Sequence, residues 1–123
     1  MELTKTEEQL MERLWAMKKA FMKDLIESYP APKPAPTTLA TLLKRMNDKG
    51  FISYRLYGNL REYYPIVRKS DYFSKHMKGL IKDFFNNSTP QFASFFTRET
   101  DMSTSELEEL KEIIEKEIQK KKE

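Results

Sequence analysis

The stretch PTTLATLLKRMNDKG, residues 36–50, separates apolar from polar positions as an amphipathic helix does. Its apolar residues follow the i, i+3, i+4, i+7 spacing of one helix face and are Leu39, Leu42, Leu43 and Met46. The opposite face carries Thr37, Thr41, Lys44 and Asp48, and Thr38 and Arg45 lie at its flank. Threonine is only a middling helix former, so helix propensity does not account for three of them. We therefore expect a helix that starts near Thr37 and ends at Gly50, with a polar face that meets a partner.

Two further helices are expected before this one. Thr4 and Glu7 have capping-box spacing, in which the hydroxyl and the carboxylate each accept a hydrogen bond from a free backbone amide. An apolar stripe follows, and we interpret Trp15 as a core anchor. A shorter helix is expected over residues 22–29, with an inner face made of Leu25, Ile26 and Tyr29.

The segment PAPKPAP, residues 30–36, interrupts the helical pattern because its four prolines remove four amide donors. It is either a turn inside one domain or a linker between two. Too little chain precedes it to bury a core alone, so we interpret it as an intradomain turn.

Strand periodicity follows in FISYRLYGNLREYYPIV, residues 51–67. Ile52, Tyr54 and Leu56 alternate with Ser53 and Arg55, which predicts a strand. The Gly58-Asn59 pair predicts a turn, and an aromatic-rich run after it predicts the second strand of a β-hairpin. Proline lacks an amide donor, so Pro65 restricts this second strand to an edge or places the proline at its end.

From Ser70 the pattern is helical again. A wide apolar stripe precedes the break NNSTP at 86–90, a short aromatic segment follows, and Ser103 and Glu106 repeat the capping-box spacing before a last helix. The expected fold class is mainly α with a small β-hairpin wing. It comprises a winged helix–turn–helix domain, residues 1–68, and a C-terminal helical dimerisation region, residues 69–123.

The order helix, helix, helix, hairpin is that of a winged helix–turn–helix, whose third helix lies in the DNA major groove. Small hydroxyl side chains allow close approach to bases and phosphates, and a cation can bind phosphate or guanine. The candidate contacts to double-stranded operator DNA are Thr37, Thr38, Thr41, Lys44 and Arg45 on the helix, and Arg55 and Arg61 on the wing.

Charge is distributed unevenly along the chain. The whole sequence has a formal net charge of +3, but residues 33–68 hold 7 basic and 2 acidic side chains. A basic block fits a polyanionic partner. An amphipathic helix with threonine and cations outside is nevertheless common, so a second hypothesis stays open. It is a protein-interaction adaptor that uses the winged-helix scaffold without sequence-specific DNA binding.

The C-terminal helices carry more apolar surface than so short a chain can cover. In small proteins such surface is usually shared with a second copy, and a homodimer would place two recognition helices on a two-fold site. The alternative is a monomer in which these helices fold back on the first domain. The candidate dimerisation residues are Leu80, Ile81, Phe84, Phe85, Leu107, Leu110, Ile113 and Ile114.

Composition argues against several other classes. Zero cysteines exclude disulfides, thiol catalysis and thiolate metal sites, and one histidine, His76, is too few for a metal centre or a triad. We expect no catalytic residue, no metal and no cofactor, and hence no enzyme. No apolar run spans a bilayer and the start of the chain lacks a secretory leader pattern, so we expect a cytoplasmic protein without direct membrane insertion.

Four segments carry a resemblance to a known family. They are LTKTEEQLMERLW near the start, TTLATLLKRMNDKGFIS through the third helix, REYYPIV after the hairpin turn, and MSTSELEELKEIIEK near the end. Together they resemble the penicillinase repressor family, the BlaI/MecI/CopY group of transcriptional regulators, over nearly the whole chain.

The resemblance implies a homodimeric repressor that a membrane-bound zinc metalloprotease sensor relieves by cutting the dimerisation half. Carried onto this chain, the cleavage point is Phe95–Phe96, and Ala40 joins the helix residues as a contact of shape only. Family members that are cut usually have asparagine where Phe95 stands, and a basic wing tip where Asn59 stands. The alternative to a protease target is that the Phe-rich segment, residues 92–96, is a buried core helix, which is the commoner role of such a segment. The copper-responsive branch senses metal through cysteines, which this chain lacks.

Overall fold

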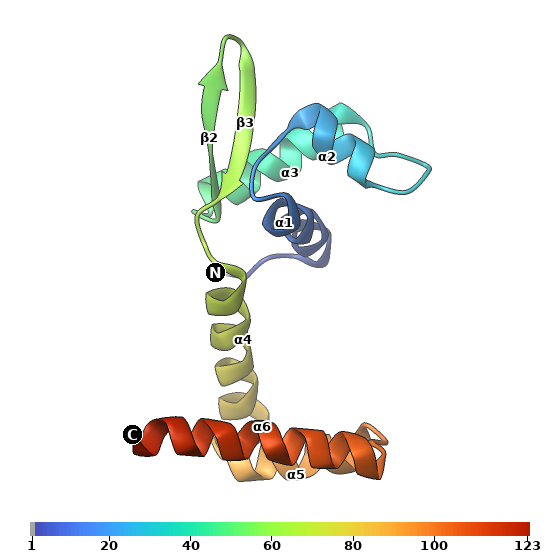
Figure 1. Ribbon diagram of the computed structural model, residues 1–123. Helices are drawn as coiled ribbons and strands as arrows, with labels where there is room; N and C mark the ends of the chain where they lie inside the picture. The colour runs from blue at the N-terminus through green and yellow to red at the C-terminus, as the bar shows by residue number, and fades with distance from the viewer. Residues whose placement is uncertain (1) are drawn as a thin grey trace. The chain divides into compact units, whose positions relative to one another are not determined.

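The computed structural model describes residues 2–123, which form two compact units. The first unit ends at Ser74 and the second is Lys75–Glu123. Six helices and a small three-stranded antiparallel sheet make up the described chain, which confirms the expected fold class. Figure 1 shows the helices of the first unit beside the hairpin.

Three helices build the helical part of the first unit, and local signals set their ends. They are α1 (Lys5–Met17), α2 (Met22–Ser28) and α3 (Pro36–Asp48). The capping box before α1 is present: Glu7 N donates to Thr4 Oγ1 at 3.2 Å, and Thr4 N donates to Glu7 Oε1 at 2.8 Å. Proline occupies the first turn of α3, and Gly50 follows its end with φ +84°, a left-handed conformation that glycine adopts without strain.

The sheet has one strand more than the sequence pattern predicts. The expected hairpin is present as β2 (Ile52–Tyr57) and β3 (Leu60–Pro65), joined at Gly58-Asn59. A two-residue strand, β1 (Ala20–Phe21), pairs antiparallel with β3, so the order is β1-β3-β2. β3 is therefore central, with Pro65 at its last position, where a missing donor is tolerated. Two residues between helices are too few to show strand periodicity, which is why β1 escapes a sequence pattern.

The core of the first unit lies between its three helices and the inner face of the sheet. Trp15 is half-buried against this core, and its indole N–H donates to the Val67 carbonyl oxygen at 2.8 Å. This supports its interpretation as an anchor, because the ring joins α1 to the chain after the hairpin. The buried apolar side chains are Leu3, Leu10, Met11, Leu14, Ala20, Leu25, Leu39, Leu42, Leu43, Met46, Phe51, Ile52, Tyr63 and Tyr72.

Three helices follow the hairpin: α4 (Lys69–Phe84), which contains the boundary between the units, α5 (Thr89–Glu99) and α6 (Thr104–Lys122). The expected capping box between Ser103 and Glu106 is present at the start of α6. Asn86 and Asn87, in the predicted break, adopt positive φ and end α4. None of the described helices is long and apolar enough to cross a membrane.

The second unit differs from the first in burial. None of residues 75–123 has a buried side chain, whereas the first unit has a closed core. An aromatic cluster lies inside it: the centre of the Phe85 ring is 5.5 Å from that of Phe92 and 5.4 Å from that of Phe95. A unit without a buried residue has little hydrophobic stabilisation as an isolated monomer.

Candidate nucleic-acid interface

The polar side of α3 is open to solvent. The four apolar residues at helical spacing are all buried in the core, and the side chains opposite them are exposed. The exposed set is Thr37, Thr38, Ala40, Thr41, Lys44 and Arg45. The apolar stripe accounts for the orientation of the helix, because its burial leaves only this side outward. The protein interior does not cover the surface on which the DNA prediction depends.

The first turn of α3 has features that suit an anion. Its N-cap residue, Ala35, makes no side-chain capping bond, and the first turn holds no acidic residue. Pro36 has no amide hydrogen and Thr38 N donates to the Ala35 carbonyl oxygen at 3.0 Å, so the attraction for phosphate comes mainly from the positive end of the helix dipole. The Thr41 hydroxyl donates to the Thr37 carbonyl oxygen at 3.0 Å, so its oxygen remains an acceptor and its methyl group a small apolar contact.

Lys44 pairs with Asp48 one turn later, with 3.5 Å between Nζ and the carboxylate. Both side chains are more than three-fifths exposed, at 80% and 63%. An exposed pair at this spacing contributes about 0.3–0.5 kcal/mol, so it holds the lysine only weakly. Lys44 is therefore able to exchange this partner for a phosphate.

Arg45 has a different environment, because it approaches the buried carboxylate of Glu7. Its Nε lies 3.6 Å from Glu7 Oε2, while Lys49 donates to Glu7 Oε1 at 2.7 Å. Glu7 is fully buried, whereas the Arg45 side chain is 52% exposed. One carboxylate thus joins the start of α1 to the last turn of α3. The capping-box spacing predicts only a capping role for Glu7, and no local pattern indicates this long-range contact.

The pKa of Glu7 reflects these partners. Burial alone raises the pKa of this carboxyl, since it disfavours the charged form. The hydrogen bonds from Lys49 and Thr4 outweigh burial and hold the Glu7 pKa below its ordinary value of 4.5. The carboxylate is therefore charged in the folded protein at neutral pH, and its charge stabilises the end of α3.

The two wing arginines lie over tyrosine rings on opposite faces of the hairpin. The Arg61 guanidinium carbon is 4.4 Å from the centre of the Tyr54 ring, and that of Arg55 is 5.8 Å from the centre of the Tyr64 ring. Directly opposite residues in the ladder share a face, and Arg55 pairs with Glu62 while Arg61 pairs with Leu56. Because neighbours along a strand alternate, the two arginines project to different sides.

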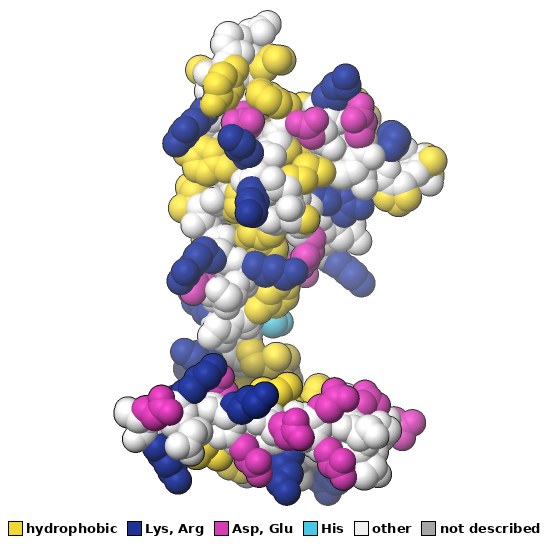
Figure 2. Space-filling model, in the orientation of Figure 1, with side chains coloured by type: hydrophobic (Ala, Val, Ile, Leu, Met, Phe, Trp, Pro, Cys, Tyr) yellow, Lys and Arg dark blue, Asp and Glu magenta, His cyan; other side chains and the backbone are white. Residues whose placement is uncertain are grey.

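A second candidate surface lies on the second unit. The predicted dimerisation residues fall on α4 and α6, except Phe85, which follows α4. Phe84, Leu107, Ile113 and Ile114 are exposed, and Leu80, Ile81, Phe85 and Leu110 are half-buried. Exposed Met77 and Ile118 lie in the same helices and were not among the predicted residues. Figure 2 shows hydrophobic side chains along the edges of α6, whose viewed face carries mixed charges.

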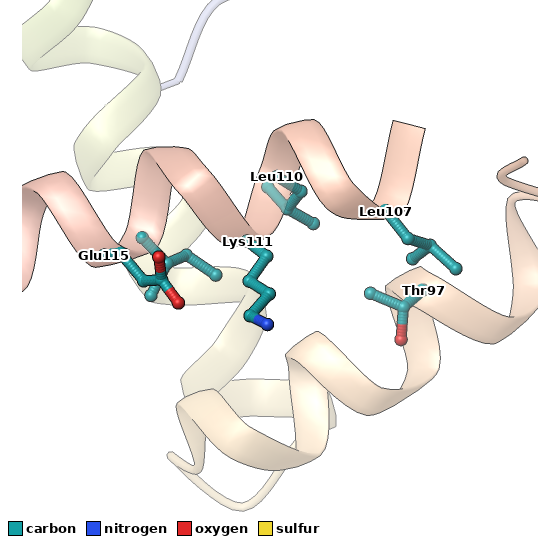
Figure 3. A pocket seen from close by; sticks show the side chains of 6 residues that line it. Thr97, Leu107, Leu110, Lys111 and Glu115 are labelled. Carbon is teal, nitrogen blue, oxygen red and sulfur yellow. The ribbon is translucent and has the colours of Figure 1, made fainter. Parts of the chain in front are cut away.

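An open, mostly apolar groove runs between α5 and α6, with a volume of about 380 Å³. It is lined by Thr97, Leu107, Leu110, Lys111, Ile114 and Glu115 (Figure 3). Three of these are predicted dimerisation residues. The groove therefore includes part of the predicted dimerisation set.

Phe95 and Phe96 lie within α5, with 50% and 40% of their surface exposed. They are not part of a buried core helix within the described chain. None of the α5 side chains is buried, and the ring contacts of this helix with the preceding segment are those of Phe92 and Phe95 with Phe85.

Comparison with known proteins identifies relatives over most of the chain. The family model described as "Penicillinase repressor" matches residues 3–116, which confirms the resemblance noted in the sequence. The "Methicillin resistance regulatory protein MecI" of Staphylococcus aureus (strain N315) is 30% identical over 116 residues, or 94% of each chain. The protein of that name from Mammaliicoccus sciuri is 29% identical over the same length. The "Penicillinase repressor" of Bacillus licheniformis is 28% identical over 89 residues, 72% of this chain and 70% of its own.

Glu7 generates a prediction about stability and pH. Its folded pKa is depressed, so its contribution is present above the ordinary pKa near 4.5 and is lost as pH falls through the lower folded value. We expect Glu7→Gln to lower the free energy of unfolding at pH 7 by about 1–3 kcal/mol, since Lys49 and Arg45 lose a charged partner. The deficit should shrink as the pH approaches 3. Urea unfolding followed by circular dichroism at several pH values measures both.

The control is Glu27→Gln, which removes an exposed carboxylate from α2. It should change the free energy of unfolding by less than about 0.5 kcal/mol at every pH. A Glu7→Gln deficit that is equally large at pH 7 and pH 3 would show that the carboxylate charge is not what stabilises the contact.

Proposed function

The chain belongs to the penicillinase repressor family, a family of transcriptional repressors, and from this premise we propose that it binds operator DNA as a homodimer. The observation that supports the proposal most directly is the exposed threonine-and-cation side of α3, with its apolar side buried in a winged-helix core. In this proposal the first domain, residues 1–68, binds DNA and residues 69–123 dimerise.

α3 lies in the major groove in this proposal. Thr37 and Thr38, beside the uncapped helix start, are placed to meet phosphate, while Thr41 offers an acceptor oxygen and a methyl group to base edges. A thymine methyl packs well against a threonine methyl, and an amino group of adenine or cytosine can donate to the hydroxyl oxygen. These contacts supply shape and part of the sequence preference.

Arg45 supplies the strongest base contact in this proposal. Glu7 meets only its Nε in the protein, and the Nη groups are the donors that guanine O6 and N7 accept as a pair. The ion pair also limits the rotamers of the side chain, which lowers the entropy lost on binding. Lys44, Arg55 and Arg61 bind backbone phosphates, so affinity falls steeply as salt concentration rises.

The absence of buried side chains in the second unit supports the proposal that it dimerises. A helical segment without a buried side chain gains stability when a second copy covers its apolar surface. A dimer holds two winged-helix domains together, so that binding of the first raises the local concentration of the second at the other half-site. Separation of the two copies therefore weakens operator binding without any change to α3.

Relief by cleavage is the second part of the proposal. A membrane-bound zinc metalloprotease sensor cuts between Phe95 and Phe96 after α5 opens locally, because a protease binds an extended segment and not a helix. The cut separates the chain before it from α6, which carries Leu107, Leu110, Ile113 and Ile114. Half of the proposed dimerisation residues are then lost, and the monomers that remain bind one half-site each.

The DNA proposal is tested on a duplex that the protein selects from a randomised pool. We expect Arg45→Ala to weaken binding of this duplex by about tenfold to a hundredfold and to relax the preference at one position of each half-site. Arg45→Lys keeps a cation beside Glu7 but cannot pair with guanine in the same way, so it should relax the preference with little loss of stability. Fluorescence anisotropy over a salt series measures the affinities.

Arg68→Ala is the matched control, since Arg68 is an equally charged, exposed residue of the first unit that pairs with Asp71. Its effect on affinity should stay within about twofold. Equal effects of Arg45→Ala and Arg68→Ala would contradict the assignment of α3. Failure of the wild-type protein to select any sequence, with only a shallow salt dependence, would favour the adaptor hypothesis.

Dimerisation is tested by placing a charge in the apolar surface of α6. Ile113→Glu should raise the Kd of the dimer by more than about a hundredfold, because a carboxylate buried at the interface lacks a partner. The helical signal of the second unit should fall in parallel, since its helices depend on the partner copy. Sedimentation velocity and circular dichroism measure the two effects.

Gln119→Glu makes the same change of charge at an exposed polar position of α6 and should leave the dimer intact. If Ile113→Glu dimerises as tightly as Gln119→Glu, this side of α6 is not the interface.

The consequence of cleavage is tested with a chain that ends at Phe95. This product mimic should be monomeric and should bind a two-fold site more than about a hundredfold more weakly than the full chain. Its affinity for an isolated half-site should equal that of the full chain. A mimic that keeps full affinity for the two-fold site would show that cleavage at this bond does not relieve repression.

A further inference from the structure

One oxygen of the buried Glu7 carboxylate lacks a hydrogen-bond donor. Oε1 accepts two hydrogen bonds, from Thr4 N at 2.8 Å and from Lys49 Nζ at 2.7 Å. Oε2 is also buried, but it accepts no hydrogen bond from the described residues. A buried acceptor without a donor is destabilising, and few remain in folded proteins, so this oxygen is a candidate for a second role.

Arg45 is the side chain that approaches this oxygen. Its Nε lies 3.6 Å from Glu7 Oε2, just beyond hydrogen-bond distance, and the arginine side chain is 52% exposed. Glu7 lies in the first turn of α1 and Arg45 in the last turn of α3, so the contact joins the interior of the fold to the outward side of α3. An approach closer by about 0.7 Å makes it a hydrogen bond of ordinary length.

We propose that Glu7 is the positioning residue for base recognition by Arg45. When DNA binds, the arginine Nε donates to the free Oε2, and its two Nη groups turn toward guanine. This inference rests on the proposed DNA binding by α3. The guanidinium carries five N–H donors in one plane, so a carboxylate at Nε leaves the Nη groups to pair with guanine O6 and N7. Glu7 itself does not touch DNA, because its side chain is fully buried.

The two oxygens of Glu7 have separate tasks in this arrangement. Oε1 joins α1 to the end of α3, and its hydrogen bonds are present in the protein alone. Oε2 gains its hydrogen bond only in the complex, so part of the affinity for the preferred duplex comes from inside the protein. Such a bond is strong, because both groups are charged and the buried carboxylate is shielded from water.

Lys44, the residue before Arg45, has no comparable anchor. Its partner Asp48 is 63% exposed and belongs to the same helix, so water and salt compete for the pair. The two neighbouring cations of α3 therefore have different roles. Lys44 binds the phosphates of any sequence, whereas Glu7 directs Arg45 toward one base.

The test is a double-mutant cycle of Glu7→Gln and Arg45→Ala in the full-length protein with the selected duplex. Glutamine also serves in a capping box, so it keeps the acceptor for Thr4 N, but it places an amide donor against the arginine Nε. We expect Glu7→Gln to weaken binding about tenfold and to relax the preference at the same base position as Arg45→Ala. When Arg45→Ala is already present, Glu7→Gln should change the affinity by less than about twofold. Fluorescence anisotropy with duplexes substituted at that position measures both effects.

Lys49→Met is the matched control, because it removes a partner of the same carboxylate but acts on Oε1. It should lower the thermal midpoint of unfolding, as Glu7→Gln does, while the base preference at the Arg45 position is retained. Any loss of affinity should be equal for all duplexes. The variants are compared at a temperature at which circular dichroism shows each of them to be folded.

A second measurement needs no variant. In the unsubstituted protein, nuclear magnetic resonance follows the exchange of the Arg45 Nε–H proton with water. This exchange should slow when the selected duplex is added, since the proton then lies in a hydrogen bond to a buried oxygen, and an unrelated duplex of the same length should slow it less.

Three results would overturn the inference while leaving DNA binding by α3 in place. Glu7→Gln could weaken binding equally with and without Arg45→Ala, which would make its effect a general one on the fold. Lys49→Met could relax the base preference as much as Glu7→Gln does. The Arg45 Nε–H proton could exchange equally fast with both duplexes. Selection of no duplex at all would count against the proposed function itself.

Discussion

The buried carboxylate of Glu7 is the interaction on which the arrangement of the first unit depends. It accepts a hydrogen bond from the Thr4 backbone amide within the capping box and another from the Lys49 side-chain ammonium, and it lies beside Arg45. An isolated charge in this position would be strongly destabilising, and partners on both helices make it tolerable. The same contact holds the last turn of α3 against the first turn of α1, so the outward side of α3 is held by the fold and not by α3 alone.

The two units differ in how many of their apolar side chains they bury. The first encloses fourteen apolar side chains, including the stripe of α3, and leaves its polar side outward. The second buries none and displays isoleucines and phenylalanines along its helices. The first unit is therefore stabilised by its own core, whereas the second has little hydrophobic stabilisation as an isolated monomer.

Local sequence signals predicted most of the secondary structure because each acts over a few residues. The capping boxes at Thr4 and Ser103, the glycine after α3 and the Gly58-Asn59 turn all lie within a turn of the element they limit. The hydrophobic period of α3 likewise identified its buried side, because residues three and four positions apart lie on the same side of a helix. The fold class followed from the order of these elements.

Tertiary structure decided what depends on residues far apart in the chain. Glu7 accepts its hydrogen bond from Lys49, the C-cap residue of α3, which is 42 residues away, and no spacing rule connects the two. The strand β1 exists only because β3 offers it a free edge, and its two residues carry no period of their own. The sequence by itself also determined that the hairpin ends in leucine, tyrosine and leucine, but their exposure follows from how far the strands extend past the helices. A sequence pattern indicates which residues share one face of a helix or strand, whereas the burial of a side chain depends on which elements pack together.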